Sequence, residues 1–416
     1  MTIIYNETEI TPGRFRDRFR IPHGHGNSEV VYFCGNSLGL QPLQAVEAVQ
    51  AELERWGGMA VTGHFDGPMP WVPYHRHAAE GLAVLTGAKP SEVVAMNALT
   101  TNLHLMLTSF YRPNADRVRI VMEKGAFPSD RHAIESQLKL HGLDPSHTLI
   151  EIAPRLDGLH HEEDLEHYLE KHGEQVALVL WPGIQYATGQ AFDLARISRS
   201  AHAQGALFGV DLAHAIGNIE LTLNSDDVDF AVWCHYKYLN SGPGAVGGCF
   251  VHEKHHQFNG PRLAGWWGHD EASRFKMAPQ HHPAHGADGW QISGPPILST
   301  APLLISLQMF LEADPIALRQ ASLALTGRLA QGLVDEVGED IEIITPLEPH
   351  RHGAQLSLKV KAGRSAGRLL FERLIGHDVI GDWREPDIIR LAPAPLYNTF
   401  DEVDHLIRLV SQLVRV

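Results

Sequence analysis

The sequence predicts an α/β protein with a mostly parallel sheet in its larger domain, followed by a smaller α+β domain. Between about residues 90 and 255, short apolar, β-branched runs alternate with amphipathic segments, a pattern typical of buried strands separated by helices. The C-terminal third instead shows helical patterns around one alternating segment. The 416 residues are enough for two or three domains, and 44% hydrophobic with 20% charged residues is an ordinary composition for a folded protein.

The first expected element is a helix over residues 42–56. Pro42 suits a first helical turn, and Gly57 follows the end. The apolar residues of this segment fall on one helical face: Leu43, Val46, Val49, Leu53 and Trp56. Gly and Pro are frequent in the next segment, so residues 57–75 are expected to form a loop.

The remaining elements follow the change from strand-like to helical patterns. Strands of the larger domain are expected at 118–122, 147–152, 176–181, 206–210, 228–233 and 247–251. In the smaller domain we expect a long helix near 315–337, a half-exposed strand at 356–360 and helices at 365–375 and 400–414. These patterns predict an N-terminal arm and helix packing on the small domain (1–60), a large domain (61–305) and a small domain (306–416).

Charge and cysteine content argue against several function classes. The chain carries 34 Lys and Arg against 49 Asp and Glu, a formal net charge of −15, so nucleic acid is not an expected partner. Only Cys34, Cys234 and Cys249 occur, which is too few for a disulfide framework and favours a reducing compartment such as the cytoplasm. Residues 1–20 lack the apolar core of a signal peptide, and no apolar run is long enough to cross a membrane.

Asp211 directly follows a strand-like run, at the edge where ligands gather in open α/β sheets. An Asp at this position either caps the segment that follows or contacts a ligand, and the position alone leaves both readings open. Lys237 comes after another such run, has Tyr236 and Tyr238 as neighbours, and precedes a Gly-rich turn. A lysine in this setting is poorly placed as a solvated surface charge, although its stem can also simply cover apolar surface.

Pyridoxal phosphate (PLP) chemistry needs such a pair. A neutral lysine amine forms the Schiff base with the cofactor, and an acid keeps the pyridine nitrogen protonated. Residues 98–102 precede a helical stretch whose first turn can bind a phosphate, or whose Thr and Asn residues simply cap the helix. Residues 127–130 offer an aromatic face to a ring, with a plain turn as the alternative.

These segments together resemble the kynureninase family of fold-type-I, aspartate-aminotransferase-like PLP enzymes. The resemblance runs from about residue 30 to the C-terminus. It is carried by the stretches 35–39 (GNSLG), 97–104 (NALTTNLH), 127–130 (FPSD), 211–218 (DLAHAIGN), 233–240 (WCHYKYLN), 265–269 (GWWGH) and 390–398 (RLAPAPLYN). Other fold-type-I enzymes share the Asp and the Lys but not these flanking residues.

The resemblance implies a homodimer that hydrolyses the Cβ–Cγ bond of L-kynurenine or 3-hydroxy-L-kynurenine, giving anthranilate or 3-hydroxyanthranilate and L-alanine. It implies that Lys237 holds PLP and moves the α-proton, that Asp211 pairs with the pyridine nitrogen, and that Tyr236 donates a proton to the β-carbon. The implied cofactor contacts also include Leu99, Thr100, Phe127, Ser129, Asp130, His214, Gly294 and Trp266, the last from the neighbouring subunit. The implied substrate contacts are Asn36, Ser37, His64, Gly294 and Arg390, whose guanidinium suits the α-carboxylate.

One position departs from the family pattern. In the segment 292–296 (ISGPP), Gly294 stands where the family carries Asn or Thr facing the substrate ring. The departure leaves the preference between the two substrates open, and the resemblance does not separate tryptophan breakdown from NAD synthesis. His64 is a candidate for a remaining polar contact with the ring, and a solvent-facing loop histidine is the alternative.

Three rival functions have weaker support. Residues 252–256 match the zinc motif H-E-x-x-H, but they directly follow a strand-like run and no third ligand is evident, so no metal is expected. The second rival is another fold-type-I PLP activity, such as a cysteine desulfurase or an aminotransferase. A desulfurase needs a reactive loop cysteine, whereas the three cysteines lie in apolar or strand-like settings. A regulatory protein with a PLP-enzyme fold would need a DNA-binding segment, and no such segment is visible.

Overall fold

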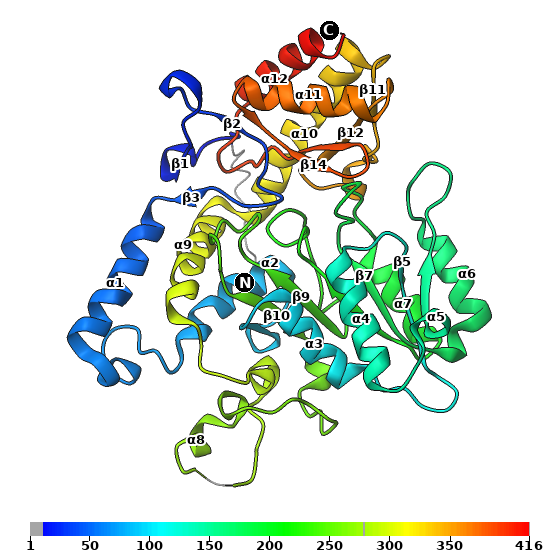
Figure 1. The fold of residues 1–416 in the computed structure, drawn as a ribbon. Helices are drawn as coiled ribbons and strands as arrows, with labels where there is room; N and C mark the ends of the chain where they lie inside the picture. Colours follow the sequence, from blue (N-terminus) through cyan, green and yellow to red (C-terminus); the bar gives the residue numbers. More distant parts are fainter. Residues whose placement is uncertain (1–10, 278, 416) are drawn as a thin grey trace, which may run out of the picture.

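The computed structural model describes residues 11–277 and 279–415. The first half of the polar N-terminal segment therefore lies outside the described residues. The described chain forms a large domain around a seven-stranded sheet and a smaller domain around a four-stranded sheet, as the sequence predicts (Figure 1).

The large sheet has the strand order β4-β10-β9-β8-β7-β5-β6. Its strands are β4 (Val93–Ala95), β5 (Arg119–Glu123), β6 (Leu149–Ile152), β7 (Val176–Pro182), β8 (Leu207–Asp211), β9 (Phe230–Cys234) and β10 (Gly247–Val251). Strands β9, β8, β7, β5 and β6 run parallel, and only β10 is antiparallel to its two neighbours. The expected strand at 147–152 is shorter than predicted, because the single-turn helix α5 (Pro145–Thr148) occupies its beginning.

Helices cover both faces of this sheet. Successive residues of β5 alternate between two cores: Val121 packs with one cluster, and Ile120 and Met122 with the other. The second cluster also contains residues of α3 (Leu99–Phe110) and α4 (Pro128–Leu140). The first cluster contains residues of α2 (Ala79–Thr86), α6 (Glu162–His172), α7 (Leu194–Ala203) and α9 (Ile297–Ala313). Because both faces are covered, the strands are almost continuously apolar.

The small domain begins with α10 (Pro315–Val337). Its antiparallel sheet has the order β11-β12-β15-β14 and lies with two further helices. These elements are β11 (Ile341–Ile343), β12 (Leu356–Val360), α11 (Arg364–Gly376), β14 (Asp382–Arg384), β15 (Ile388–Leu391) and α12 (Phe400–Leu413). The expected domain boundary at residue 305 falls inside α9, whose Met309 and Phe310 belong to the large-domain core. We therefore propose a boundary at Asp314, where α9 and α10 meet at 82°.

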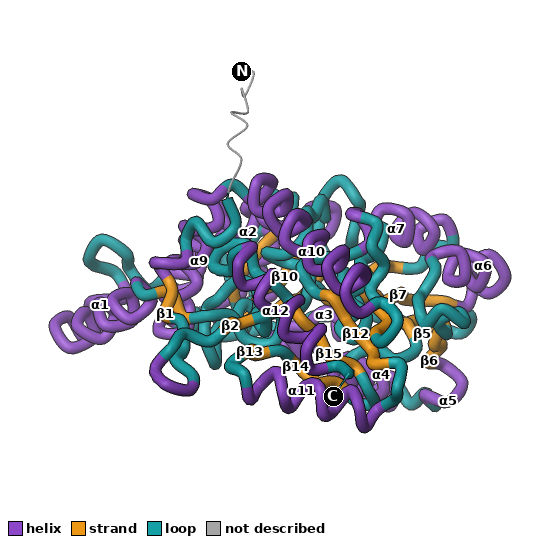
Figure 2. Tube along the Cα trace, turned by 90° about the horizontal axis from the view of Figure 1, so that it is seen from above, coloured by secondary structure: helices purple, strands orange, loops and turns teal. Residues whose placement is uncertain are grey.

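The N-terminal arm packs on the small domain through β2 (Val31–Tyr32), which pairs in parallel with β13 (Val379–Ile380). The predicted helix forms α1 (Gln44–Met59) but packs against α9 and not on the small domain, so that part of the prediction is wrong. Figure 2 shows α1 projecting from one end of the molecule. Its predicted apolar face is exposed, with 54% of Val46, 44% of Leu53 and 63% of Trp56 accessible.

No single helix in residues 11–277 or 279–415 is long and apolar enough to cross a membrane, although α9 and α10, taken together as a bent pair, pass by length and composition alone.

Candidate active site

A cavity lies where β5 and β8 end and the loop after β9 begins. It brings together most of the residues that the sequence predicts as cofactor contacts, from four separate segments. These residues are Leu99, Thr100, Phe127, Ser129, Asp130, Asp211, His214, Tyr236 and Lys237. Parallel strands end at one edge of the sheet, so side chains distant in sequence meet here.

Lys237 lines this cavity. Its Nζ lies 3.0 Å from Nε2 of His214 and 5.9 Å from the centre of the Tyr236 ring. The loop that carries Lys237 packs against the predicted turn at residues 35–39, where the Gly39 amide donates to the Tyr236 carbonyl at 2.8 Å. A Cβ at Gly39 would collide with the backbone oxygen of Lys237, so glycine is required for this close approach.

Asp130 and Asp211 form a buried carboxyl pair beside Lys237. Burial raises the pKa of both groups, and the charge of Asp211 raises the pKa of Asp130 further. Asp211 accepts a 2.6 Å hydrogen bond from the Ala213 amide, which favours its ionised form. Asp130 is therefore the member of the pair that holds a proton more readily, and Asp211 is the member that more readily stays ionised.

His214 is neutral in this setting. Burial lowers its pKa well below the usual value, and the positive charge of Lys237 acts in the same direction. Among the described residues, its buried Nδ1 has no hydrogen-bond partner, and neither does Oδ1 of Asp130. Unpaired buried polar atoms are rare, and here they mark a place where a bound polar ring is accommodated.

One part of the cavity wall suits a phosphate. The first turns of α3 and α4 both lie there, and neither helix has a side-chain cap on its free amides. Oγ1 of Thr100 lies 2.8 Å from Oγ of Ser129, so two hydroxyl groups supplement the amides. Helix N-termini with free amides bind anions. PLP fits this set of groups: a lysine with a neutral histidine beside it, a paired acid, the aromatic ring of Phe127 and the two helix N-termini.

Arg390 lies at the small-domain side of the cavity. It is fully buried, pairs with Asp382, and donates from Nη1 to the carbonyl oxygen of Tyr186 at 2.7 Å. Tyr186 lines the cavity, and its ring packs edge-on against Phe127 at 5.3 Å. The guanidinium is therefore placed beside the cavity with its own counter-charge already bound.

The two predicted contacts in the turn at 35–39 are placed differently. Asn36 is fully buried and donates to Oε1 of Gln355 at 2.8 Å, so it joins the arm to the small domain. Ser37 is half-buried, and its amide donates to the Cys34 carbonyl. Neither residue lines the cavity around Lys237.

Three other predicted residues, His64, Trp266 and Gly294, also lie outside that cavity. Gly294 lines a neighbouring cavity together with Tyr236. His64 and Trp266 belong to one exposed aromatic surface, which we define by four residues. These are His64, Phe65, Phe275 and Trp266, whose rings follow one another in this order. The ring centres lie 6.3 Å apart for His64 and Phe65, 5.5 Å for Phe65 and Phe275, and 5.4 Å for Phe275 and Trp266.

Among the polar and aromatic residues that line the cavity, sequence reasoning missed two, Glu123 and Tyr186. Glu123 lines it at the end of β5, and burial raises its pKa well above the usual value. Its position after an apolar run is the same signal that identified Asp211, and it was available in the sequence. Tyr186 lies in the loop that follows β7, and no local pattern in the sequence pointed to it.

The rival motifs do not form sites. Residues 252–256 follow β10 and contain a single 3-10 turn (Glu253–His255), not an α-helix that would align the two histidines. His255 instead hydrogen bonds to the buried Asp229 at 2.7 Å. No group of three metal-ligating side chains occurs within the described ranges. Burial raises the pKa of Cys34 to about 12 and also raises that of Cys234, so neither thiol is activated as a nucleophile.

Two family models match the chain: aminotransferase class-V over residues 31–266 and the kynureninase C-terminal domain over residues 318–410. The kynureninase of Xanthomonas campestris pv. campestris (strain B100) is 57% identical over 397 residues, covering 95% of this chain and 93% of that protein. The kynureninase of Stenotrophomonas maltophilia (strain K279a) is 56% identical over 398 residues, covering 95% and 94%.

Solved structures confirm the fold. The cystine C–S lyase C-DES in complex with cysteine persulfide has a TM-score of 0.78 at 19% identity and covers 93% of this chain and 99% of its own. The apo cysteine desulfurase from Thermococcus onnurineus NA1 has a TM-score of 0.75 at 18% identity, with coverage of 93% and 95%. The match over nearly the whole length to curated relatives, together with the two family models, shows that the chain belongs to the kynureninase family of PLP-dependent hydrolases that cleave a carbon–carbon bond.

Proposed function

We propose that this protein hydrolyses L-kynurenine and 3-hydroxy-L-kynurenine in the cavity around Lys237. The observation that carries the proposal is the placement of Lys237 between a neutral His214 and the Asp130–Asp211 pair. When bound, PLP supplies an electron sink for breaking a bond next to the substrate amino group. The residues around it hold the cofactor, orient the substrate and move protons.

Each residue has a role that follows from its surroundings. The Lys237 amine holds the cofactor and then moves the α-proton, with the neutral His214 at 3.0 Å as its hydrogen-bond partner. Asp211 stays charged and keeps the pyridine nitrogen protonated. Burial raises the pKa of Tyr236, so its hydroxyl keeps its proton at neutral pH and can donate it to the β-carbon. Phe127 covers the ring, and Thr100 and Ser129 bind the phosphate.

Arg390 is proposed to bind the substrate α-carboxylate. Desolvation in its buried position lowers the pKa of Arg390 from its ordinary value, and the carboxylate of Asp382 opposes this effect. Arg384 also donates to Asp382, at 2.8 Å, so the local charge is two cations against one anion. A substrate carboxylate would complete the neutralisation. A bidentate guanidinium–carboxylate pair also fixes the orientation of the α-carbon.

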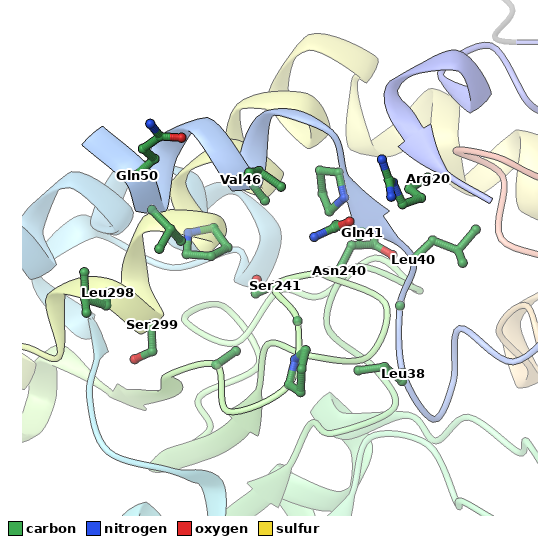
Figure 3. Close-up of a pocket in the computed structure, with 18 of the residues that line it drawn as sticks. Arg20, Leu38, Leu40, Gln41, Val46, Gln50, Asn240, Ser241, Leu298 and Ser299 are labelled. Atoms are coloured by element: carbon green, nitrogen blue, oxygen red, sulfur yellow. The ribbon is translucent and has the colours of Figure 1, made fainter. Parts of the chain in front are cut away.

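A homodimer explains several exposed features. The apolar face of α1 borders a groove of about 910 Å³ that also reaches Leu38, Asn240–Ser241 and the first turn of α9 (Figure 3). Phe65, Trp266 and Phe275 are 58%, 47% and 46% exposed. Apolar side chains that gather along an exposed groove are typical of a protein interface. We propose that a second copy covers the groove and that each copy presents its aromatic surface to the partner's cavity.

We further propose a cytoplasmic location, which the sparse cysteines support.

Mixing two inactive variants tests this shared site. A Lys237→Ala protein and a Trp266→Ala protein should regain activity after exchange of subunits. The expected recovery is about one quarter of wild-type activity, because half of randomly mixed dimers are hybrids and each hybrid has one intact site. A monomer that is fully active at assay concentration would rule out the shared site.

The lack of a side chain at Gly294 determines how strongly we expect the site to discriminate between the two substrate rings. A residue without a side chain cannot hydrogen bond to a substrate hydroxyl, so the strong discrimination that such bonds give is absent at this position. A Cβ at Gly294 would lie 3.6 Å from the Trp267 ring, an ordinary contact, so a side chain fits. We propose that kynurenine and 3-hydroxykynurenine are both accepted, with kcat/KM values that differ by less than about 200-fold.

Gly294→Asn should move the ratio of the two kcat/KM values toward the hydroxylated substrate, because the new amide lies near the ring. The measurement is kcat/KM for both substrates with wild type and variant. A wild-type preference above about 10⁴-fold would show that another residue recognises the hydroxyl. An unchanged ratio in the variant would show that position 294 does not face the ring.

A further inference from the structure

The loop after α1 holds His64 in a defined place. Its two arms pair through the backbone, with the Trp71 amide donating to Gly63 and the Val72 amide to His64, both at 3.1 Å. The His64 ring stands edge-on to the Trp71 ring, 5.3 Å between centres and 87° between planes. A Cβ at Gly63 would lie only 2.8 Å from the Trp71 ring, so the indole is packed directly against this backbone.

The Trp71 ring is fixed in turn by a buried carboxylate on α1. Glu52 is 4% exposed, and its Oε2 accepts from Nε1 of Trp71 at 2.8 Å while its Oε1 accepts from the Tyr74 hydroxyl at 2.9 Å. Arg55, one turn later, lies 3.3 Å from Oε2 of Glu52 and also donates to the carbonyl of Met69 in the same loop. The Met69–Trp71 arm of the loop and Tyr74 after it therefore contact this one carboxylate or its cation partner.

A buried carboxylate is a costly way to attach a helix to a loop. Charges are rarely buried unless they are paired, and apolar residues of similar size usually stabilise a contact at least as well. The other buried residue of α1 is Ala45, and the helix also packs along α9, so Glu52 is not its sole attachment. What the carboxylate adds is direction: two hydrogen bonds fix the plane of the indole against which His64 rests.

We infer that Glu52 is a positioning residue for substrate recognition, which holds Trp71 so that His64 faces the aryl end of the substrate in the partner's site. The inference rests on the proposed function, which places the aromatic surface at that site. Glu52 touches neither substrate nor cofactor in this account. Its effect should therefore appear in KM and in ring selectivity, and not in the proton transfers at Lys237.

Glu52→Gln is the variant that tests this role. The amide has the same size but only one acceptor oxygen, so one of the two hydrogen bonds is lost and Arg55 loses its counter-charge. We expect KM for kynurenine to rise about 10-fold, the low end of what modest pocket differences give, with kcat changed less than about 2-fold. The matched control is Glu54→Gln, the same substitution at an exposed residue of the same helix, which should leave KM unchanged.

A double-mutant cycle with His64→Ala separates positioning from general stability. If Glu52 acts through His64, Glu52→Gln should raise KM less than about 2-fold in the His64→Ala background, because coupled residues are not additive. Trp71→Phe removes the indole donor and should show the same non-additivity with His64→Ala. This variant replaces Glu52→Gln in the cycle if Glu52→Gln does not fold. Melting temperature with PLP bound is measured for every variant.

The outcomes are distinct. If the double variant shows the product of the KM effects of Glu52→Gln and His64→Ala, the positioning role is overturned and the proposed function stays intact. A His64→Ala variant with unchanged KM and unchanged selectivity would remove His64 from the substrate site, and the role of Glu52 with it. Neither result bears on Lys237, which is tested separately by labelling.

Discussion

Lys237→Ala is expected to abolish turnover while the protein still folds and binds PLP without a covalent bond. The variant loses both the amine that holds the cofactor and the base that moves the α-proton. Loss of a group with both roles should lower kcat by at least about 10⁴-fold. Phe127, Thr100 and the Asp130–Asp211 pair remain to hold the cofactor. The measurement is turnover of kynurenine with saturating PLP, with Lys171→Ala, an exposed lysine on α6, as the control.

The same site has a chemical signature. The wild-type protein should be yellow, and borohydride should fix the cofactor irreversibly to Lys237, which peptide mapping identifies. A label on a different lysine would show that the cavity around Lys237 is not the cofactor site. A Lys237→Ala protein with near wild-type turnover would lead to the same conclusion.

Asp211→Asn should have the second-largest effect. An amide cannot stabilise the positive charge of a protonated pyridine nitrogen, so the ring accepts electrons less well. Removing one such electrostatic partner in a buried site costs about 10²- to 10³-fold in kcat. The matched comparison is Asp130→Asn. Asp130 holds a proton more readily than Asp211, and an amide is likewise neutral and can donate, so this variant should lose less than about 10-fold.

The order of these two effects is the informative result. Both variants are measured at saturating PLP, with bound PLP determined for each, so that weak cofactor binding is not mistaken for slow chemistry. A larger loss for Asp130→Asn than for Asp211→Asn would show that the proton sits on Asp211 and that the roles are exchanged.

Strand ends were the most predictable part of the site. The apolar runs that end at Asp211 and shortly before Lys237 form β8 and β9, neighbours in the sheet, so local pattern and chain direction were enough to bring the pair together. The same rule applied to β5 would have found Glu123. Helix α1 shows the limit of such patterns. Its apolar periodicity is correct, but periodicity does not tell whether the covering surface belongs to the same chain.

Contacts between distant segments were not predictable from local patterns. Glu52 and Trp71 lie on a helix and in a loop, and the sequence gives no sign that an acid on an exposed helix is buried. The pairing of Arg390 with Asp382 depends on the register of β14 against β15, which sequence alone does not specify. Asn36 is expected as a substrate contact from the family resemblance alone, and local pattern gave no sign of its hydrogen bond to Gln355.

Product analysis tests the central claim most directly. Purified protein loaded with PLP is incubated separately with L-kynurenine, 3-hydroxy-L-kynurenine and L-cysteine, and the aromatic product, alanine and released sulfur are quantified. The account predicts equal amounts of anthranilate and L-alanine from kynurenine, the matching hydroxylated product from the second substrate, and no turnover of cysteine. Release of sulfur from cysteine without anthranilate from kynurenine would contradict it, and would assign to this chain the chemistry named for its structural neighbours.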